Sequence, residues 1–282
     1  MIRENLIVEF YDGKERQIRV VLPKDYKTSG KKYPVLYMLD GQNLFDLEDS
    51  LSGSTWEVRE ALEQLLEENK LDPMIIVGID HAEEMRLTEY SPWDLDIDNN
   101  HVEGEGTIFS DFLINKLIPE LETIYPLRSD QAGRTLAGSS MGALITVYIA
   151  LKYPDHFSNY GIFSLCSWVN KPAFNDQFEQ ARSLSPAKYF IQVGGREGYN
   201  STTQIEDSAA SAAYLKDTKE LVDQLYSLGV PPKDITLQIG RDDWHSEVAW
   251  RKYMPDFLLW IQNRRKKVTP SVQSVYQEKF TF

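Results

Sequence analysis

The decapeptide LAGSSMGALI at residues 136–145 constrains the fold more than any other stretch of the chain. It holds a G-x-S-x-G motif centred on Ser140, between an apolar segment typical of a strand and one typical of a helix. Where a strand turns abruptly into a helix only small neighbours fit, so we expect glycine to be required at Gly138 and Gly142. The pattern predicts that Ser140 is a nucleophile beside the positive end of a helix. In the alternative interpretation, the serine only caps the helix in a tight turn.

Composition restricts the classes of partner. The 282 residues contain 30 Lys and Arg against 43 Asp and Glu, which gives a formal net charge of −13. Nucleic acid and anionic membranes would repel such a chain, so we expect neither as a partner. No signal-peptide pattern opens the sequence, and no apolar run approaches the roughly 18 residues that span a bilayer. The single cysteine, Cys166, favours a reducing compartment, so we predict a cytoplasmic protein.

Short apolar runs predict the strands. Residues 5–11 and 16–22 are strand-like and flank Asp12-Gly13, a hairpin turn signal. Six further runs are typical of strands buried on both faces, at residues 35–39, 74–79, 134–137, 160–165, 189–193 and 235–239.

Helical segments lie between most of these runs. We predict helices at residues 55–70 behind a capping box that starts at Ser54, at 108–125 with a kink or split at Pro119, at 209–228 before Gly229, and at 246–264. The alternation predicts one α/β domain over residues 1–282. It would have a mostly parallel sheet, helices on both faces and an antiparallel N-terminal hairpin. The tail at residues 269–282 could be an arm onto a partner or a frayed end.

A serine nucleophile needs a base and an acid. Of the four histidines, only His245 follows the last predicted strand and precedes the final helix, where the chain order serine, acid, histidine places the base. Glu197 follows the strand at 189–193 on a glycine-bounded loop, and we predict that it is the acid. Asp207 is the alternative acid.

Two aspartates close to the predicted base, Asp242 and Asp243, are expected to cap the helix that follows.

Two backbone N–H groups are needed to stabilise a tetrahedral oxyanion. Met141, directly after the nucleophile, is predicted to supply the first. The loop after residues 35–39 is predicted to supply the second from Gln42, with Asn43 as the alternative. Gly41 would let this backbone come close.

Two segments beyond strand ends are predicted to form the substrate pocket, the lid-like loop at residues 80–106 and an insertion at 165–175. We expect Arg86, Trp93 and Trp168 near the ligand, where aromatic rings can stack on a flat group and the guanidinium can meet an anionic or phenolic one. This favours an aryl or catecholate ester.

In the alternative interpretation, both tryptophans only pack the lid, and Arg86 pairs with Glu83 or Glu89 at the surface.

Five segments together carry a family resemblance: PVLYMLDGQNLFD, RLTEYSPWD, LAGSSMGAL, VGGREG and WHSEVAWRKYMPDFLLWI. In this order they resemble the esterases related to enterochelin and siderophore esterases and to esterase D, over about residues 33–260. The resemblance implies the α/β-hydrolase fold, hydrolysis of carboxylic esters, and a triad of Ser140, Glu197 and His245. Two positions depart from it. Ala143 stands where many relatives have a second glycine, and Asp40 stands where esterase D-like members have histidine.

We therefore expect a serine esterase that forms an acyl-enzyme and acts without a cofactor on a small-molecule ester, of the siderophore, aryl or sugar type. An acyltransferase with the same triad and a non-catalytic binding protein of the same fold are the alternatives. No metal site is predicted. Acidic and amide residues between 94 and 105 fall at calcium-loop spacing, but Asn99 replaces the usual turn glycine. The oligomeric state stays open.

Overall fold

A computed structural model describes residues 1–97, 100–181, 184 and 186–262, so the tail at 269–282 lies outside the described residues. Within these ranges the main sheet has eight strands, in the order β1-β2-β4-β3-β7-β8-β9-β12. Their bounds are β1 (Ile2–Glu9), β2 (Glu15–Leu22), β3 (Val35–Leu39), β4 (Ile75–Ile79), β7 (Arg134–Ser139), β8 (Asn159–Phe163), β9 (Lys188–Gly194) and β12 (Ile235–Gly240).

The sheet is mostly parallel, as predicted. Strands β4, β3, β7, β8, β9 and β12 run parallel to one another. The antiparallel hairpin β1-β2 joins them through an antiparallel pairing of β2 with β4. Its turn contains Gly13 at a φ of 75°, a conformation that glycine adopts without strain.

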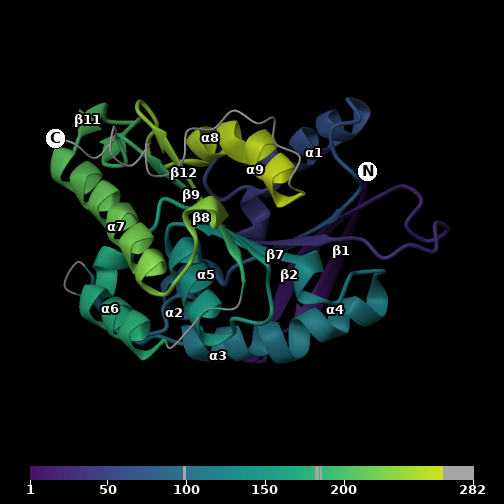
Figure 1. Cartoon of the computed structure of the whole chain (residues 1–282), viewed down its shortest axis with the longest axis horizontal. Helices are drawn as coiled ribbons and strands as arrows, with labels where there is room; N and C mark the ends of the chain where they lie inside the picture. The colour runs from purple at the N-terminus through teal and green to yellow at the C-terminus, as the bar shows by residue number, and fades with distance from the viewer. Residues whose placement is uncertain (98–99, 182–183, 185, 263–282) are drawn as a thin grey trace.

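Helices cover both faces of the sheet (Figure 1). Leu36 and Met38 of β3 pack with α1 (Val58–Glu67) and α9 (Met254–Ile261) on one face. Because successive strand residues point to opposite faces, Val35 and Tyr37 enter the other core. The helices on that face are α3 (Gly106–Phe112), α4 (Ile118–Ile124), α5 (Met141–Lys152), α6 (Lys171–Gln180) and α7 (Ser208–Ser227).

Two of the predicted helices change their hydrogen-bonding pattern close to a proline. The segment at 108–125 is helical without a gap as far as Ile124, as α3, a π-helical turn at Leu113–Leu117, and α4, which has Pro119 in its first turn. The predicted helix at 246–264 is instead α8 (Glu247–Trp250), a 3₁₀ turn and α9, with Pro255 in the first turn of α9. Proline has no N–H to donate to the preceding turn, so it is accommodated where a helix starts.

Two predicted caps are wrong. In the described chain, the residue before α1 is Glu57, at a φ of 50°, and its side chain makes no capping bond, so the capping box from Ser54 does not form. Ser246, rather than Asp242 or Asp243, caps α8 by accepting from the Ala249 N–H.

Asp243 is buried instead of capping a helix. Its carboxylate accepts from Lys252 and, at 2.6 Å, from the Tyr253 hydroxyl.

The lid-like segment at 80–106 contains short regular elements. These are a 3₁₀ turn (Glu83–Met85), the helix α2 (Arg86–Tyr90) and a small hairpin of β5 (Leu95–Ile97) and β6 (Asn100–Val102). The insertion at 165–175 becomes a 3₁₀ turn (Ser167–Asn170) and the start of α6. A further small hairpin, β10 (Tyr199–Asn200) and β11 (Ile205–Glu206), precedes α7. No helix in the described part of the chain is long and apolar enough to cross a membrane.

Candidate active site

Ser140 lies at the junction of β7 and α5 in a strained conformation, with φ 57° and ψ −121°. Its N–H donates to the Phe163 carbonyl at 2.9 Å, and its own carbonyl accepts from the first turn of α5. A Cβ on Gly138 would lie 2.5 Å from the Gly142 carbonyl oxygen, so no side chain fits there. A non-glycine residue held at positive φ is a recurrent feature of functional turns.

The glutamate and the histidine meet directly. His245 Nδ1 lies 2.7 Å from Glu197 Oε2. The other carboxylate oxygen accepts from the Ser164 hydroxyl at 2.6 Å and from the Gly194 N–H at 2.5 Å. The Glu197 side chain is fully buried, whereas that of His245 is 27% exposed. Each carboxylate oxygen thus has a hydrogen-bond partner, and the imidazole is held in one orientation while part of its ring stays exposed.

Sequence reasoning missed two residues that support this pair. Ser164 is fully buried at a φ of 48°, and its hydroxyl accepts from the Trp250 indole N–H at 2.8 Å. The Trp250 ring also packs edge-on against His245, with ring centroids 5.1 Å apart. Ser164 lies near the end of the strand predicted at residues 160–165, and in the structure it directly follows β8, the neighbour of β7, so its place at a strand end was the available signal.

Asp207, the alternative acid, has a different partner. Its carboxylate caps α7 by accepting from the N–H groups of Ala209 and Ala210 at 3.0 Å. In the described part of the chain, Glu197 is the carboxylate that contacts His245.

The Ser140 hydroxyl has other neighbours than the imidazole. No hydrogen bond joins Ser140 to His245 among the described residues. Its side chain instead lies near the Cys166 thiol and the Tyr214 phenol, where it opposes the rise that burial gives to the pKa of each group. Catalytic hydrogen bonds are often long before substrate binds, so this arrangement is compatible with a nucleophile.

The two predicted oxyanion donors are the backbone N–H groups of Gln42 and Met141. Within the described residues, the backbone N–H groups of Gln42 and Met141 have no acceptor in the chain. Gln42 belongs to the 3₁₀ turn Gly41–Asn43, and Met141 is the first residue of α5. A Cβ on Gly41 would lie 2.6 Å from Asp80 Oδ1 and 2.7 Å from the backbone of Gly78, so glycine lets this turn rest against β4. Free N–H groups at such turns can bind developing negative charge.

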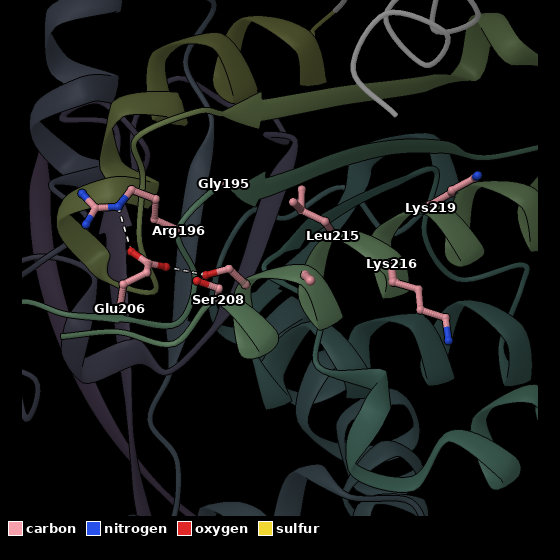
Figure 2. A pocket seen from close by; sticks show the side chains of 9 residues that line it. Gly195, Arg196, Glu206, Ser208, Leu215, Lys216 and Lys219 are labelled. Carbon is pink, nitrogen blue, oxygen red and sulfur yellow. Dashed lines mark hydrogen bonds and ion pairs between the residues drawn. The ribbon is translucent and has the colours of Figure 1, made fainter. Parts of the chain in front are cut away.

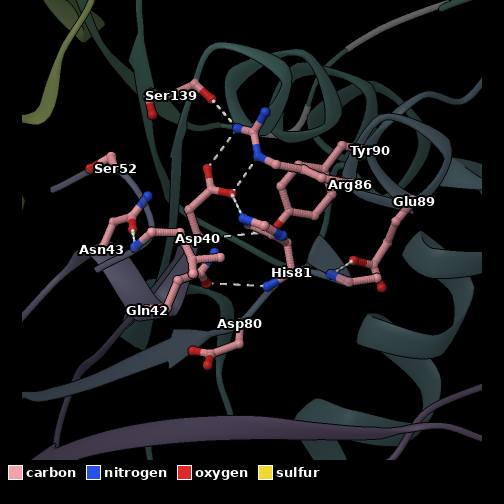
Figure 3. A network of polar contacts seen from close by, with 12 residues as sticks. Asp40, Gln42, Asn43, Ser52, Asp80, His81, Arg86, Glu89, Tyr90 and Ser139 are labelled. Carbon is pink, nitrogen blue, oxygen red and sulfur yellow. Dashed lines mark hydrogen bonds and ion pairs between the residues drawn. The ribbon is translucent and has the colours of Figure 1, made fainter. Parts of the chain in front are cut away.

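An ion pair links the segments that carry these amides (Figure 3). Arg86 donates through Nε and Nη2 to the two carboxylate oxygens of Asp40, at 2.7 and 2.8 Å. Nη2 also reaches the Ser139 carbonyl at 3.4 Å. Asp40 precedes the Gly41 turn and Ser139 precedes Ser140, so the guanidinium bridges both loops. Arg86 therefore pairs with Asp40, and its role as a ligand group stays a prediction.

The two tryptophans of the predicted pocket have different surroundings. Trp93 packs edge-on against Tyr148 of α5 and Phe174 of α6, at 6.0 and 6.5 Å between ring centroids. Trp168 is 48% exposed and packs edge-on against Tyr214 at 6.2 Å. Since Tyr214 in turn contacts His245, Trp168 is connected to the candidate site through one residue.

Two cavities lie on either side of the Glu197 loop. A cavity of about 650 Å³ borders His245 and is formed by residues 52–54, 197–202 and 244–248, most of them polar and uncharged. A second one, of about 680 Å³, lies along α7 and holds none of the predicted site residues (Figure 2). Arg196 closes its wall by donating to Glu206 at 2.9 Å. No cluster of His, Cys, Asp or Glu that could hold a metal occurs in the described ranges, which omit Asp98 of the calcium-like spacing.

Two buried titratable groups lie near the Asp40–Arg86 pair. Burial lowers the pKa of His81 to about 4, and burial raises the pKa of Glu89 to about 7. Glu89 accepts from the Ala82 N–H through Oε2 at 3.0 Å. Its Oε1 has no hydrogen-bond partner among the described residues, with Arg16 Nη2 3.7 Å away. Both groups are therefore held largely neutral near pH 6.

The chain is similar in sequence to a known protein family. Residues 11–261 match the model of the Esterase family, described as "Putative esterase". The uncharacterised protein YbbA of Bacillus subtilis is 26% identical over 89% of this chain and 94% of its own length. An endo-1,4-beta-xylanase/feruloyl esterase of Xylanibacter ruminicola is 26% identical over 72% of this chain and 26% of its length.

Solved structures share the fold. The BES protein of Bacillus cereus is 22% identical, with a TM-score of 0.68 over 92% of this chain and 94% of its own. The siderophore hydrolase EstA of Aspergillus nidulans is 17% identical, with a TM-score of 0.72 over 94% and 95%. The enterobactin esterase FES of Shigella flexneri is 17% identical, with a TM-score of 0.71 over 93% and 59%. These likenesses confirm the predicted α/β-hydrolase fold.

The raised pKa of Glu89 predicts how stability depends on pH. The folded chain keeps a proton on Glu89 that the unfolded chain loses above the ordinary value of 4.5, so this group destabilises the fold as pH rises from about 4.5 to about 7. Glu89→Gln should therefore stabilise the protein at pH 8, by on the order of 3 kcal/mol, and have little effect at pH 4.5. Urea unfolding at both pH values measures this.

His81 does not disturb that comparison, because its lowered pKa affects both proteins equally. Glu84→Gln, at an exposed position on the same segment, is the matched control and should change nothing. An equal effect of Glu89→Gln at both pH values would contradict the prediction.

Proposed function

Because this chain belongs to the esterase family and is a carboxylic ester hydrolase, we propose that it works as a serine esterase with Ser140 as nucleophile, His245 as base and Glu197 as acid. The observation that carries the proposal is the 2.7 Å contact between His245 Nδ1 and a fully buried Glu197. That contact leaves Nε2 of the imidazole as the basic atom.

The reaction follows from these positions. The Ser140 oxygen attacks the acyl carbon while His245 takes its proton, and the imidazolium that forms is stabilised by Glu197. The N–H groups of Gln42 and Met141 receive the oxyanion. His245 then protonates the departing alcohol, and water activated by His245 releases the acid. No cofactor takes part in this sequence.

We further propose an ester with an aromatic group as the substrate. Trp168, half-exposed beside Tyr214, offers a ring on which such a group could stack. The polar cavity next to His245 would suit a hydroxylated leaving group or acid. Among the similar proteins, the feruloyl esterase of Xylanibacter ruminicola is named for an ester of an aromatic acid, which agrees with this class.

Ser140→Ala tests the nucleophile. It should leave the fold intact and lower kcat for a short p-nitrophenyl ester by about 10⁴- to 10⁶-fold, since only oxyanion binding and substrate positioning remain. The assay is repeated with acceptor alcohols to detect acyl transfer. A variant that keeps more than about a tenth of the activity would place the nucleophile elsewhere.

Glu197→Gln tests the acid. Loss of the charge that stabilises the imidazolium should lower kcat by roughly 10²- to 10⁴-fold with little change in KM. Asp207→Asn is the matched control, because asparagine also caps helices well and the fold should be kept. If the aspartate variant were the impaired one, the acid would be misassigned.

Trp168→Ala tests the aromatic substrate. Direct stacking should cost about 1–3 kcal/mol in kcat/KM on an aryl ester, by analogy with base–aromatic stacking, and much less on a short alkyl ester. Trp93→Ala provides the comparison, because that ring packs against α5 and α6. Equal losses on both esters would mean that Trp168 supports the fold and does not contact the substrate.

A further inference from the structure

The short helix α2 of the lid-like segment holds the turn that carries the Gln42 N–H. Asp40 directly precedes that turn, in a left-handed conformation with φ 57° and ψ 47°. Its N–H donates to the Tyr90 hydroxyl at 3.2 Å, and its carboxylate accepts from Arg86 at 2.7 and 2.8 Å. Arg86 and Tyr90 are the first and last residues of α2, and the guanidinium packs over the Tyr90 ring, 5.2 Å from its centroid. One helix thus contacts both the backbone and the side chain of the residue that starts the turn.

The same ion pair lies against the start of α5 (Figure 3). A Cβ on Gly142, the residue after Met141, would lie 3.3 Å from Asp40 Oδ2. Arg86 Nη2 reaches the carbonyl of Ser139 at 3.4 Å, on the other side of the nucleophile. The carboxylate and the guanidinium therefore lie between the two segments that carry the predicted oxyanion donors, and they contact both.

The orientation of the guanidinium is set by the protein itself. Nε and Nη2 form one edge of Arg86, and this edge matches the two oxygens of Asp40, whose residue is 4% exposed. His81 Nε2 lies 3.9 Å from the same carboxylate, too far for a hydrogen bond. A left-handed conformation at a residue other than glycine persists only where the surroundings hold it. The ion pair is such a restraint, so without it we expect the turn after Asp40 to relax.

We propose that Arg86 and Asp40 are positioning residues, whose ion pair holds the Gln42 N–H at the distance from the Met141 N–H that a tetrahedral oxyanion requires. This inference rests on the proposed function, and it replaces the ligand role that the sequence predicts for Arg86. Hydrogen bonds to the oxyanion strengthen as charge develops on the oxygen. A displaced amide therefore weakens the transition state more than the bound ester, and the loss falls on kcat.

Arg86→Ala tests this role. On p-nitrophenyl acetate we expect kcat to fall by about 10- to 100-fold, less than the 10²- to 10³-fold loss that follows outright removal of an oxyanion donor. KM should stay within about threefold. A trifluoromethyl ketone, which forms a tetrahedral adduct with a nucleophilic serine, should lose affinity by about the same factor as kcat/KM. A residue that only stabilises the fold would not link these two losses.

A charged substrate separates positioning from binding. The same variant is assayed on p-nitrophenyl acetate and on the mono-p-nitrophenyl ester of succinic acid, which carries a carboxylate on its acyl group. If Arg86 positions the amide, kcat falls by the same factor on both esters. If Arg86 instead binds an anionic group of the substrate, KM rises on the succinate ester alone.

A double-mutant cycle shows whether the two residues act as a pair. Asp40→Asn removes the charge, and asparagine tolerates the left-handed conformation. It should lower kcat about as much as Arg86→Ala, and the double variant should lose no more than about threefold beyond either one. Arg134→Ala is the matched control, because Arg134 forms a mostly buried pair with Glu122 at the opposite end of β7, with Nε 3.0 Å from the carboxylate. It should leave kcat unchanged.

The outcomes separate this inference from the proposed function. An unchanged kcat in Arg86→Ala, a loss confined to KM on the succinate ester, or additive losses in the cycle would each overturn the inference. If Ser140→Ala keeps its activity, the proposed function fails instead, whatever the Arg86 variants do. Thermal unfolding shows whether each variant is folded. Should Arg86→Ala not fold, Arg86→Lys takes its place, because lysine keeps the charge but cannot donate two parallel hydrogen bonds, and the same fall in kcat is expected.

Discussion

The buried carboxylate of Glu197 is the group on which the arrangement of this site depends. A carboxylate removed from water without partners would cost several kcal/mol, so its donors must be held in place. Those donors come from three segments: Ser164 after β8, Gly194 at the end of β9, and His245 after β12. Satisfying one side chain therefore fixes the ends of three parallel strands relative to one another.

The segment around Ser140 is held by a second set of charged groups. Asp40 and Arg86 form a two-pronged ion pair, and the guanidinium also reaches the carbonyl of Ser139. The pair spans from the loop after β3 to the end of β7, which are the segments that carry Gln42 and Met141. The pair thus helps to set the distance between the backbone N–H groups of Gln42 and Met141, and a planar, always charged guanidinium is well suited to this.

Aromatic rings pack against the imidazole of His245. His245 lies between Tyr214 of α7 and Trp250 of α8, and Trp250 also donates to the serine that holds Glu197. The rings restrict the imidazole without adding charge, so Glu197 remains its ionic partner. Tyr214 also contacts the half-exposed Trp168, which connects the proposed catalytic groups to the predicted substrate pocket.

The sequence by itself determined the order of elements and the residues at strand ends. The apolar runs and Gly138 are visible in the local sequence, and Ser140, Glu197 and His245 each follow one of those runs. A parallel sheet brings the ends of its strands to one edge whatever the loops contain. Only the tertiary structure decided which side chains meet across that edge. The sequence patterns around Ser164, Trp250 and Tyr214 indicate that these residues are buried, but not which residues they contact. A hydrogen bond or a ring contact depends on positions far apart in the chain. Arg86 shows the same limit: its charge indicated a ligand group or a surface pair, but the fold placed Asp40 beside it.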